Sequence, residues 1–187
     1  MPQGIRDSLV GALIMAGVST LGDFIWVVWI PRHLPVYGMS HGTSLFAVLG
    51  LVLGAFAGRR LAGTLAGAGV GFAAAGSFYL LAPSVGFSVM FVVWFGIWIA
   101  LAFLDSWLNR LNGSNGSNSV PPAGSLAVRG VSAAVLSGIA FYLVSGIWMP
   151  FNPVGLDYLV HFVAWTFAFL PGFCSIFLKP AAVEKAK

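Results

Sequence analysis

The sequence predicts an all-α integral membrane protein with six transmembrane helices, and two observations support this fold class. Only 7% of the 187 residues are charged and 59% are hydrophobic, which gives a mean hydropathy of +0.94. A soluble domain carries about 25% charged residues. In addition, six apolar stretches are long enough to cross a bilayer, which takes about 20 residues each. We therefore expect a single six-helix transmembrane domain over residues 1–187.

The predicted spans cover, in chain order, residues 8–30, 43–58, 61–81, 86–104, 125–149 and 156–178. The first is too long for the apolar part of a cleavable signal peptide and contains Asp23, so we expect it to remain as a helix. The second is short and could begin as early as Met39. Prolines occur in the connections 31–41, 82–85 and 150–155, and these connections are predicted turns because proline cannot continue a helix.

The connection between the fourth and fifth spans has a different composition. It contains the run NGSNGSNS over residues 112–119. Such a low-complexity run is typical of a flexible linker. It resembles an engineered replacement for a disordered loop, although a natural linker would have the same composition, and no function follows from it.

The distribution of basic residues predicts the orientation of the chain in the membrane. Eight of the nine lysines and arginines fall on the side that holds both termini, whereas Arg32 alone falls on the other side. Because basic residues favour the cytoplasmic side, both termini are predicted to be cytoplasmic. Topology therefore explains the net charge of +4 without a nucleic-acid partner. The eight residues are Arg6, Arg59, Arg60, Arg110, Arg129, Lys179, Lys185 and Lys187.

Small residues at four-residue spacing mark the second and third spans. The stripe in the second span is Gly50, Gly54 and Gly58, and the stripe in the third is Gly63, Gly67, Gly71 and Ala75. Small residues four apart lie on one helix face and let two backbones approach closely. We expect a tightly packed antiparallel hairpin in which the stripes face one another or another helix.

Asp23 is the ionisable residue that lies deepest in a predicted span. A charge within the hydrocarbon is costly, so such a residue is a functional candidate. Ser19 and Thr20, four and three residues earlier, share its helix face. Two interpretations stay open: Asp23 binds a proton or a ligand, or it is a structural carboxyl group hydrogen-bonded to these hydroxyls or to a neighbouring helix.

Asp105 is predicted to end the fourth span, where a negative charge opposes the helix dipole. A basic partner should compensate it. Arg129, at the start of the next span, is the first candidate and Arg110 the second. The pair is either a structural ion pair or a docking point for a membrane-protein partner.

Histidines and a carboxylate gather on the predicted outer side. Asp157 and His161 are four residues apart on one helix face, and His33 and His41 belong to the first outer connection. Imidazole and carboxylate groups can bind zinc, but no pair has the HxxxH or HExxH spacing. An Asp157–His161 hydrogen bond is therefore expected rather than a metal site, and no cofactor is predicted. No nucleophile elbow, phosphate loop or dinucleotide motif occurs either, so the chain is predicted not to be an enzyme.

Two tryptophans of the fourth span, Trp94 and Trp98, lie too deep for the aromatic belt at the membrane surface. They face lipid, a neighbouring helix or an internal cavity. If a cavity exists, Tyr142 of the fifth span is a further candidate for its wall.

The order of these features resembles the Insig family of six-span, sterol-sensing membrane proteins. The stretch GTSLFAVLGL over 42–51 is similar to GTAAAVVGLL at the start of the family's second span. Residues 96–105, which end in Phe-Leu-Asp, look like the GLWWTFD end of its fourth span. The segments 152–159 and 170–171 resemble the loop and helix that open its sixth span.

The chain departs from the family pattern at two places. VYGMSH over 36–41 stands where the family has a tryptophan-rich, double-proline, cysteine-containing segment, and Ser106 replaces an arginine. The resemblance implies a six-helix fold with a lipid-accepting cavity, and in the family this fold senses sterols and docks to a sterol-sensing partner. Short loops and abundant alanine and glycine favour a bacterial, for instance mycobacterial, homologue. The membrane would then be the plasma membrane rather than the endoplasmic reticulum.

Together these features predict a non-catalytic sensor or binding module that holds a sterol or a diacylglycerol-like lipid between its helices. The predicted lipid-binding residues are Asp23, Trp94, Trp98, Tyr142 and His161. The first alternative is a small proton-coupled transporter that uses Asp23. The second is a lipid-modifying enzyme with its chemistry at the outer histidines.

Overall fold

The computed structural model describes residues 1, 3–30, 34–111, 121–148, 150 and 152–178, with the backbone alone at 87 and 145–148. Within these residues the chain is helical and contains no strand. Six helices in this part of the chain are long and apolar enough to cross a membrane, in agreement with the predicted integral membrane protein. The elements are α1 (Gln3–Phe24), the π-helix η1 (Ile25–Trp29), α2 (Pro35–Phe56), α3 (Arg60–Val85), the 3-10 helix η2 (Gly86–Ser88), α4 (Val89–Leu111), α5 (Ala123–Trp148) and α6 (Asp157–Phe177).

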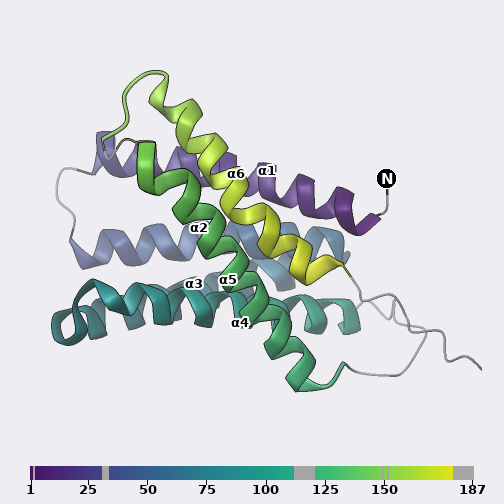
Figure 1. Ribbon diagram of the computed structural model, residues 1–187. Helices are drawn as coiled ribbons and strands as arrows, with labels where there is room; N and C mark the ends of the chain where they lie inside the picture. The colour runs from purple at the N-terminus through teal and green to yellow at the C-terminus, as the bar shows by residue number, and fades with distance from the viewer. Residues whose placement is uncertain (2, 31–33, 112–120, 149, 151, 179–187) are drawn as a thin grey trace, which may run out of the picture.

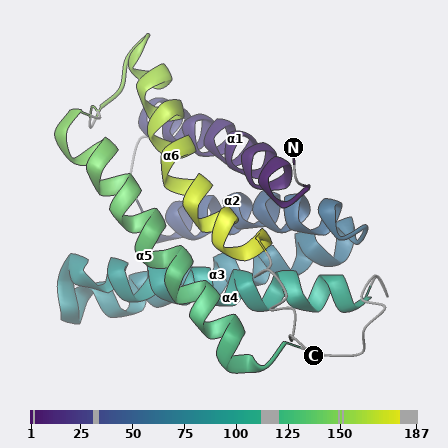
Figure 2. The ribbon, with the colours of Figure 1, turned by 45° about the vertical axis from the view of Figure 1, so that its right-hand side comes forward.

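The helices form a closed ring (Figures 1 and 2). Each of α1 to α5 packs against the next helix in the chain, and α6 returns to pack along α1. In both views α5 and α6 are inclined to α2, α3 and α4. This ring places the amino-terminal and carboxy-terminal helices side by side, so groups far apart in the sequence can meet in its interior.

The connection predicted over 31–41 is too long, because α2 already begins at Pro35. Proline is well tolerated in the first turn of a helix, where its missing N–H has no intrahelical partner to lose. His41 consequently lies on α2 and not in a loop. The turn predicted at 82–85 is wrong, since these residues complete α3 with Pro83 inside the helix. The chain turns instead at Gly86, whose φ of 69° is open mainly to glycine.

The fourth helix is longer at its carboxyl end than predicted. It continues beyond residue 104 to Leu111, so Asp105 lies inside the helix rather than at its end. Asn109, one turn further on, donates from Nδ2 to the Asp105 Oδ1 atom at 3.1 Å. The true end of α4 is capped by the Arg59 guanidinium, which donates to the Leu111 carbonyl oxygen, and a positive charge at this position is favourable for the helix dipole.

The glycine stripes of α2 and α3 face one another, which is one of the two arrangements that the sequence predicted. A Cβ atom built on Gly67 would lie 2.7 Å from the Gly50 Cα atom, and one on Gly63 would lie 2.8 Å from the Gly54 Cα atom. The two backbones are therefore in direct contact. Gly58 makes the hairpin possible: its φ is 69°, and the following Arg59 N–H donates to the Gly54 carbonyl, which is a Schellman helix end.

Candidate functional site

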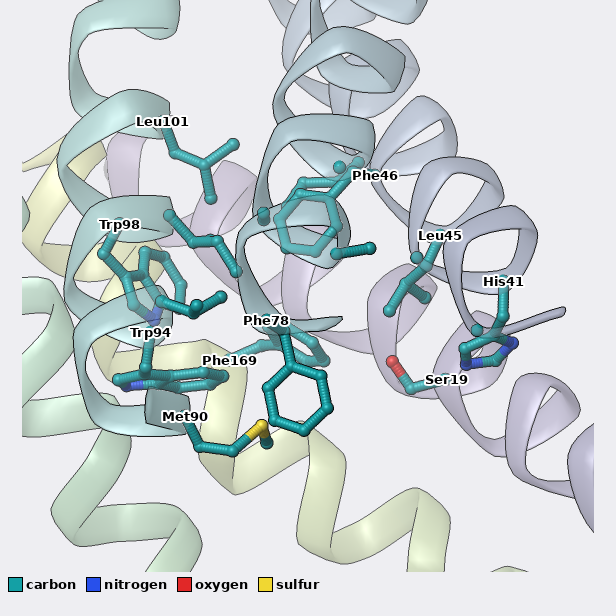
Figure 3. A pocket seen from close by; sticks show the side chains of 18 of the residues that line it. Ser19, His41, Leu45, Phe46, Phe78, Met90, Trp94, Trp98, Leu101 and Phe169 are labelled. Atoms are coloured by element: carbon teal, nitrogen blue, oxygen red, sulfur yellow. The ribbon is translucent and has the colours of Figure 1, made fainter. Parts of the chain in front are cut away.

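A cavity of about 440 Å³ lies inside the ring. Its walls come from α1, η1, α2, α3, α4 and α6, and most of them are apolar or aromatic. Figure 3 shows Phe46 and Leu45 on one side of the space and Trp94 and Trp98 on the other. Cavities of this size and lining are typical of small-molecule sites.

One end of the cavity carries a hydrogen-bond network centred on Asp23. The Asp23 Oδ2 atom lies 2.8 Å from His161 Nδ1 and accepts a hydrogen bond from the Trp165 indole N–H at 2.7 Å. The other ring nitrogen of His161, Nε2, lies 2.8 Å from the Pro150 carbonyl oxygen. The network thus joins α1, α6 and the connection before α6. Asp23 and Trp165 line the cavity, whereas His161 lies behind Asp23.

Local backbone geometry helps to place these groups. Asp23 is the penultimate residue of α1, and the chain continues directly into the five-residue π-helix η1. A π-turn widens the helix and is frequent at functional sites. Here Trp26 of η1 lines the cavity, and its ring centroid lies 5.6 Å from that of His41 on α2.

Asp23 is hydrogen-bonded to the neighbouring helix α6 and not to the hydroxyls on its own helix, and both interpretations of its role stay open. Within the described residues, the Ser19 and Thr20 hydroxyl oxygens are buried and have no hydrogen-bond partner. Ser19 is only 4% exposed and lines the cavity, where Figure 3 shows its hydroxyl. It is therefore available to a bound molecule.

Trp94 and Trp98 both line the cavity, with ring centroids 5.9 Å apart. The Trp94 indole donates to the Ala134 carbonyl of α5 at 3.0 Å. Trp98 is 1% exposed, and its indole N–H has no partner among the described residues. The placement of Tyr142 in the wall is wrong: the residue is 74% exposed, and none of the α5 side chains that the structure describes lines this cavity.

The expected Asp157–His161 hydrogen bond does not form. His161 uses both ring nitrogens on other partners, and the Asp157 Oδ2 atom instead accepts from the Val154 N–H at 3.0 Å. Among the described residues there is no group of three histidine, cysteine or acidic side chains that could hold a metal. His33 and the run 112–119 lie outside those residues. The Asp105–Arg129 ion pair stays a prediction.

A second cavity of about 380 Å³ lies between α3 and α4. It shares Ala74, Val93 and Ile97 with the central cavity, so these side chains form a common wall. The rest of its lining consists mainly of alanine, glycine and branched aliphatic residues. The seam between α3 and α4 is therefore a thin part of the ring.

Sequence reasoning missed several members of the site. The stacked rings of Trp165 and Phe169 form its α6 wall, and Phe46 and Phe78 face it from α2 and α3. Trp165 lies four residues after His161 on the same helix face, and this spacing is the sequence signal that could have placed Trp165 in the site. No family model, curated protein or solved structure matches the chain. The chemistry of the cavity itself must therefore indicate what it binds.

Proposed function

We propose that this protein is a non-catalytic binding module that holds one sterol or diacylglycerol-like lipid in the central cavity. The observation that carries the proposal is an apolar space of about 440 Å³ with a hydrogen-bonding group at one end. Such a space suits an amphiphile whose apolar body contacts the aromatic walls. Its polar head would lie beside Asp23, behind which His161 is buried.

Two buried polar groups in the walls support an oxygen-bearing ligand. The Ser19 hydroxyl lines the cavity without a hydrogen-bond partner in the described residues, and Trp98, whose indole N–H also has no partner among them, is one of the wall residues. Buried polar groups in proteins are usually hydrogen-bonded. A hydroxyl can donate and accept, so Ser19 suits a hydroxyl or an ester carbonyl oxygen of a ligand. Sterols and acylglycerols both carry such atoms.

The seam between α3 and α4 supports entry from the bilayer. A lipid that reaches the cavity from the membrane has to pass between two helices. The small side chain of Ala74, together with Val93 and Ile97, lines both cavities along this seam. We therefore take this seam as the lateral opening of the site.

Membrane orientation and family belong to the same proposal. The excess of basic residues near both termini supports a cytoplasmic location for each of them. The Insig-like motifs support a relative of that family, and the short loops with abundant alanine and glycine support a bacterial homologue in the plasma membrane. Asp105 and Arg129 on the predicted cytoplasmic half are then candidates for contact with a membrane-protein partner.

Native mass spectrometry of the gently purified protein tests the proposal. A stoichiometric sterol or acylglycerol is the expected result. Leu45→Trp fills space inside the cavity and should weaken lipid binding about tenfold. A steric clash of only about 1.4 kcal/mol changes a dissociation constant by that factor. Leu51→Trp on the exposed face of the same helix should retain it. An empty wild-type protein, or equal retention in both variants, would refute a lipid site in this cavity.

The hydrogen bond between Asp23 and His161 favours one second candidate, a proton-coupled carrier. Ionisable pairs inside a membrane bundle are common in proton pathways. Proteoliposomes under an imposed membrane potential, with a trapped pH-sensitive dye, distinguish the two candidates. A carrier would move protons, and this flux would collapse in Asp23→Asn. A binding module should show no flux above that of protein-free liposomes.

A further inference from the structure

We infer that Asp23 and His161 together form a proton-binding site, whose single shared proton holds α1, α6 and the α5–α6 connection together at the polar end of the cavity. Hydrogen-bond geometry fixes the number of protons. The Pro150 carbonyl oxygen can only accept, so the hydrogen of that bond has to be on His161 Nε2. The 2.8 Å bond between His161 Nδ1 and Asp23 Oδ2 then needs one more hydrogen between two atoms that both accept when deprotonated.

That proton can reside on either partner. A carboxylate beside an imidazolium and a carboxylic acid beside a neutral imidazole contain the same number of protons. The Trp165 N–H also donates to the Oδ2 atom at 2.7 Å. Because donors to a carboxylate stabilise its charge, we assign the ion pair. Both forms contain one proton more than an ionised Asp23 beside a neutral His161.

In the described part of the chain, no other titratable side chain forms a hydrogen bond with Asp23. Within the described part of the chain, His161 is the one ion-pair partner of Asp23, with side-chain exposures of 5% and 25% respectively. His41 faces Asp23 from α2 as the second nearby histidine. On α6, Tyr158 lies 6.1 Å from His161 by ring centroids, and Asp157 is held by the Val154 N–H. None of the lysines and arginines in the described ranges lines the cavity.

Loss of the proton would leave two acceptor atoms 2.8 Å apart with no hydrogen between them. The bond between α1 and α6 would then become repulsive, and α1 would separate from the start of α6. Since the closed form binds one proton more than the open form, its stability decreases as the pH rises. The pair would thus act as a pH-dependent latch at the polar end of the cavity, whichever molecule the cavity holds.

The test is the thermal unfolding midpoint of the delipidated protein in detergent, measured at about pH 6 and about pH 9. The wild-type midpoint should decrease by about 5 °C or more over this range. In Asp23→Asn the amide can donate to a neutral imidazole, so the contact needs no shared proton. Its midpoint should be lower at the acidic pH, because the Trp165 bond is lost, but independent of pH. Asp157→Asn should retain the wild-type pH dependence.

A wild-type midpoint that does not change with pH, or an Asp23→Asn protein with the full wild-type dependence, would overturn the inference. If Asp23→Asn does not fold, magnetic resonance of the wild-type protein decides. The imidazole nitrogen-15 and carboxyl carbon-13 signals of the pair should show one shared proton at a pH where exposed histidines are neutral. A bare Nδ1 atom beside an ionised Asp23 would refute the proton-binding site.

Discussion

Gly67→Leu is expected to abolish the folded protein, because the α2–α3 hairpin has no room for a side chain at this position. A Cβ atom there would lie 2.7 Å from the Gly50 Cα atom and 2.9 Å from its backbone nitrogen. Backbone atoms cannot move aside as the end of a flexible side chain can. The two helices would have to separate along their whole contact, which also carries Gly54 and Gly63 and forms one wall of the cavity.

Gly69→Leu is the matched control. Gly69 lies on the same helix two residues further on, and an added Cβ atom would meet nothing within 4 Å. This variant should give the same monodisperse peak and thermal midpoint as the wild type in size-exclusion chromatography and thermal unfolding. Gly67→Leu should aggregate or be degraded during expression. A stable, monodisperse Gly67→Leu protein would show that the close approach of the two backbones is dispensable.

The glycine stripes also illustrate which parts of the fold the sequence could predict. Span length, hydropathy and small residues at four-residue spacing are local properties, so the six helices and the close hairpin followed from them. Helix ends were less predictable. Pro35 and Pro83 suggested turns, yet each lies inside a helix, since one occupies the first turn and the other is followed by less than one further turn. In a membrane, neighbouring helices can satisfy the backbone groups that a proline frees.

The site was predictable only in part, because its key contact is long-range. Asp23 and His161 could each be identified as costly polar residues in an apolar span. Their pairing depends on the packing of α6 against α1, which no local pattern indicates, so His161 was matched with the nearer Asp157. The depth of Trp94 and Trp98 left lipid, a neighbouring helix and a cavity open, and both residues line the cavity in the structure. Tyr142 faces outward, since it is 74% exposed and the described side chains of α5 do not reach this cavity.

Asp23→Ala is expected to destabilise the protein by about 3 kcal/mol near neutral pH, since removing one partner of a buried ion pair leaves the other without compensation. We take the lower end of the known range because the Asp23 side chain is partly exposed. His161, almost fully buried, would lose the partner of its Nδ1 atom, and the Trp165 indole would lose its acceptor. Asp157→Ala is the control: it removes a carboxylate that accepts one backbone N–H, and we expect a loss of about 1 kcal/mol.

The double variant Asp23→Ala with His161→Leu separates a paired latch from two independent residues. If the two side chains act on one another, the double variant should cost little more than Asp23→Ala alone, with a coupling free energy of about 2 kcal/mol. Once the carboxylate is absent, replacing the buried imidazole by an apolar side chain removes a polar group that has already lost one of its two partners. Denaturant titration of the four proteins in mixed micelles measures this cycle. Additive losses would mean that Asp23 and His161 stabilise the bundle separately, and the contact between α1 and α6 would then depend on apolar packing alone.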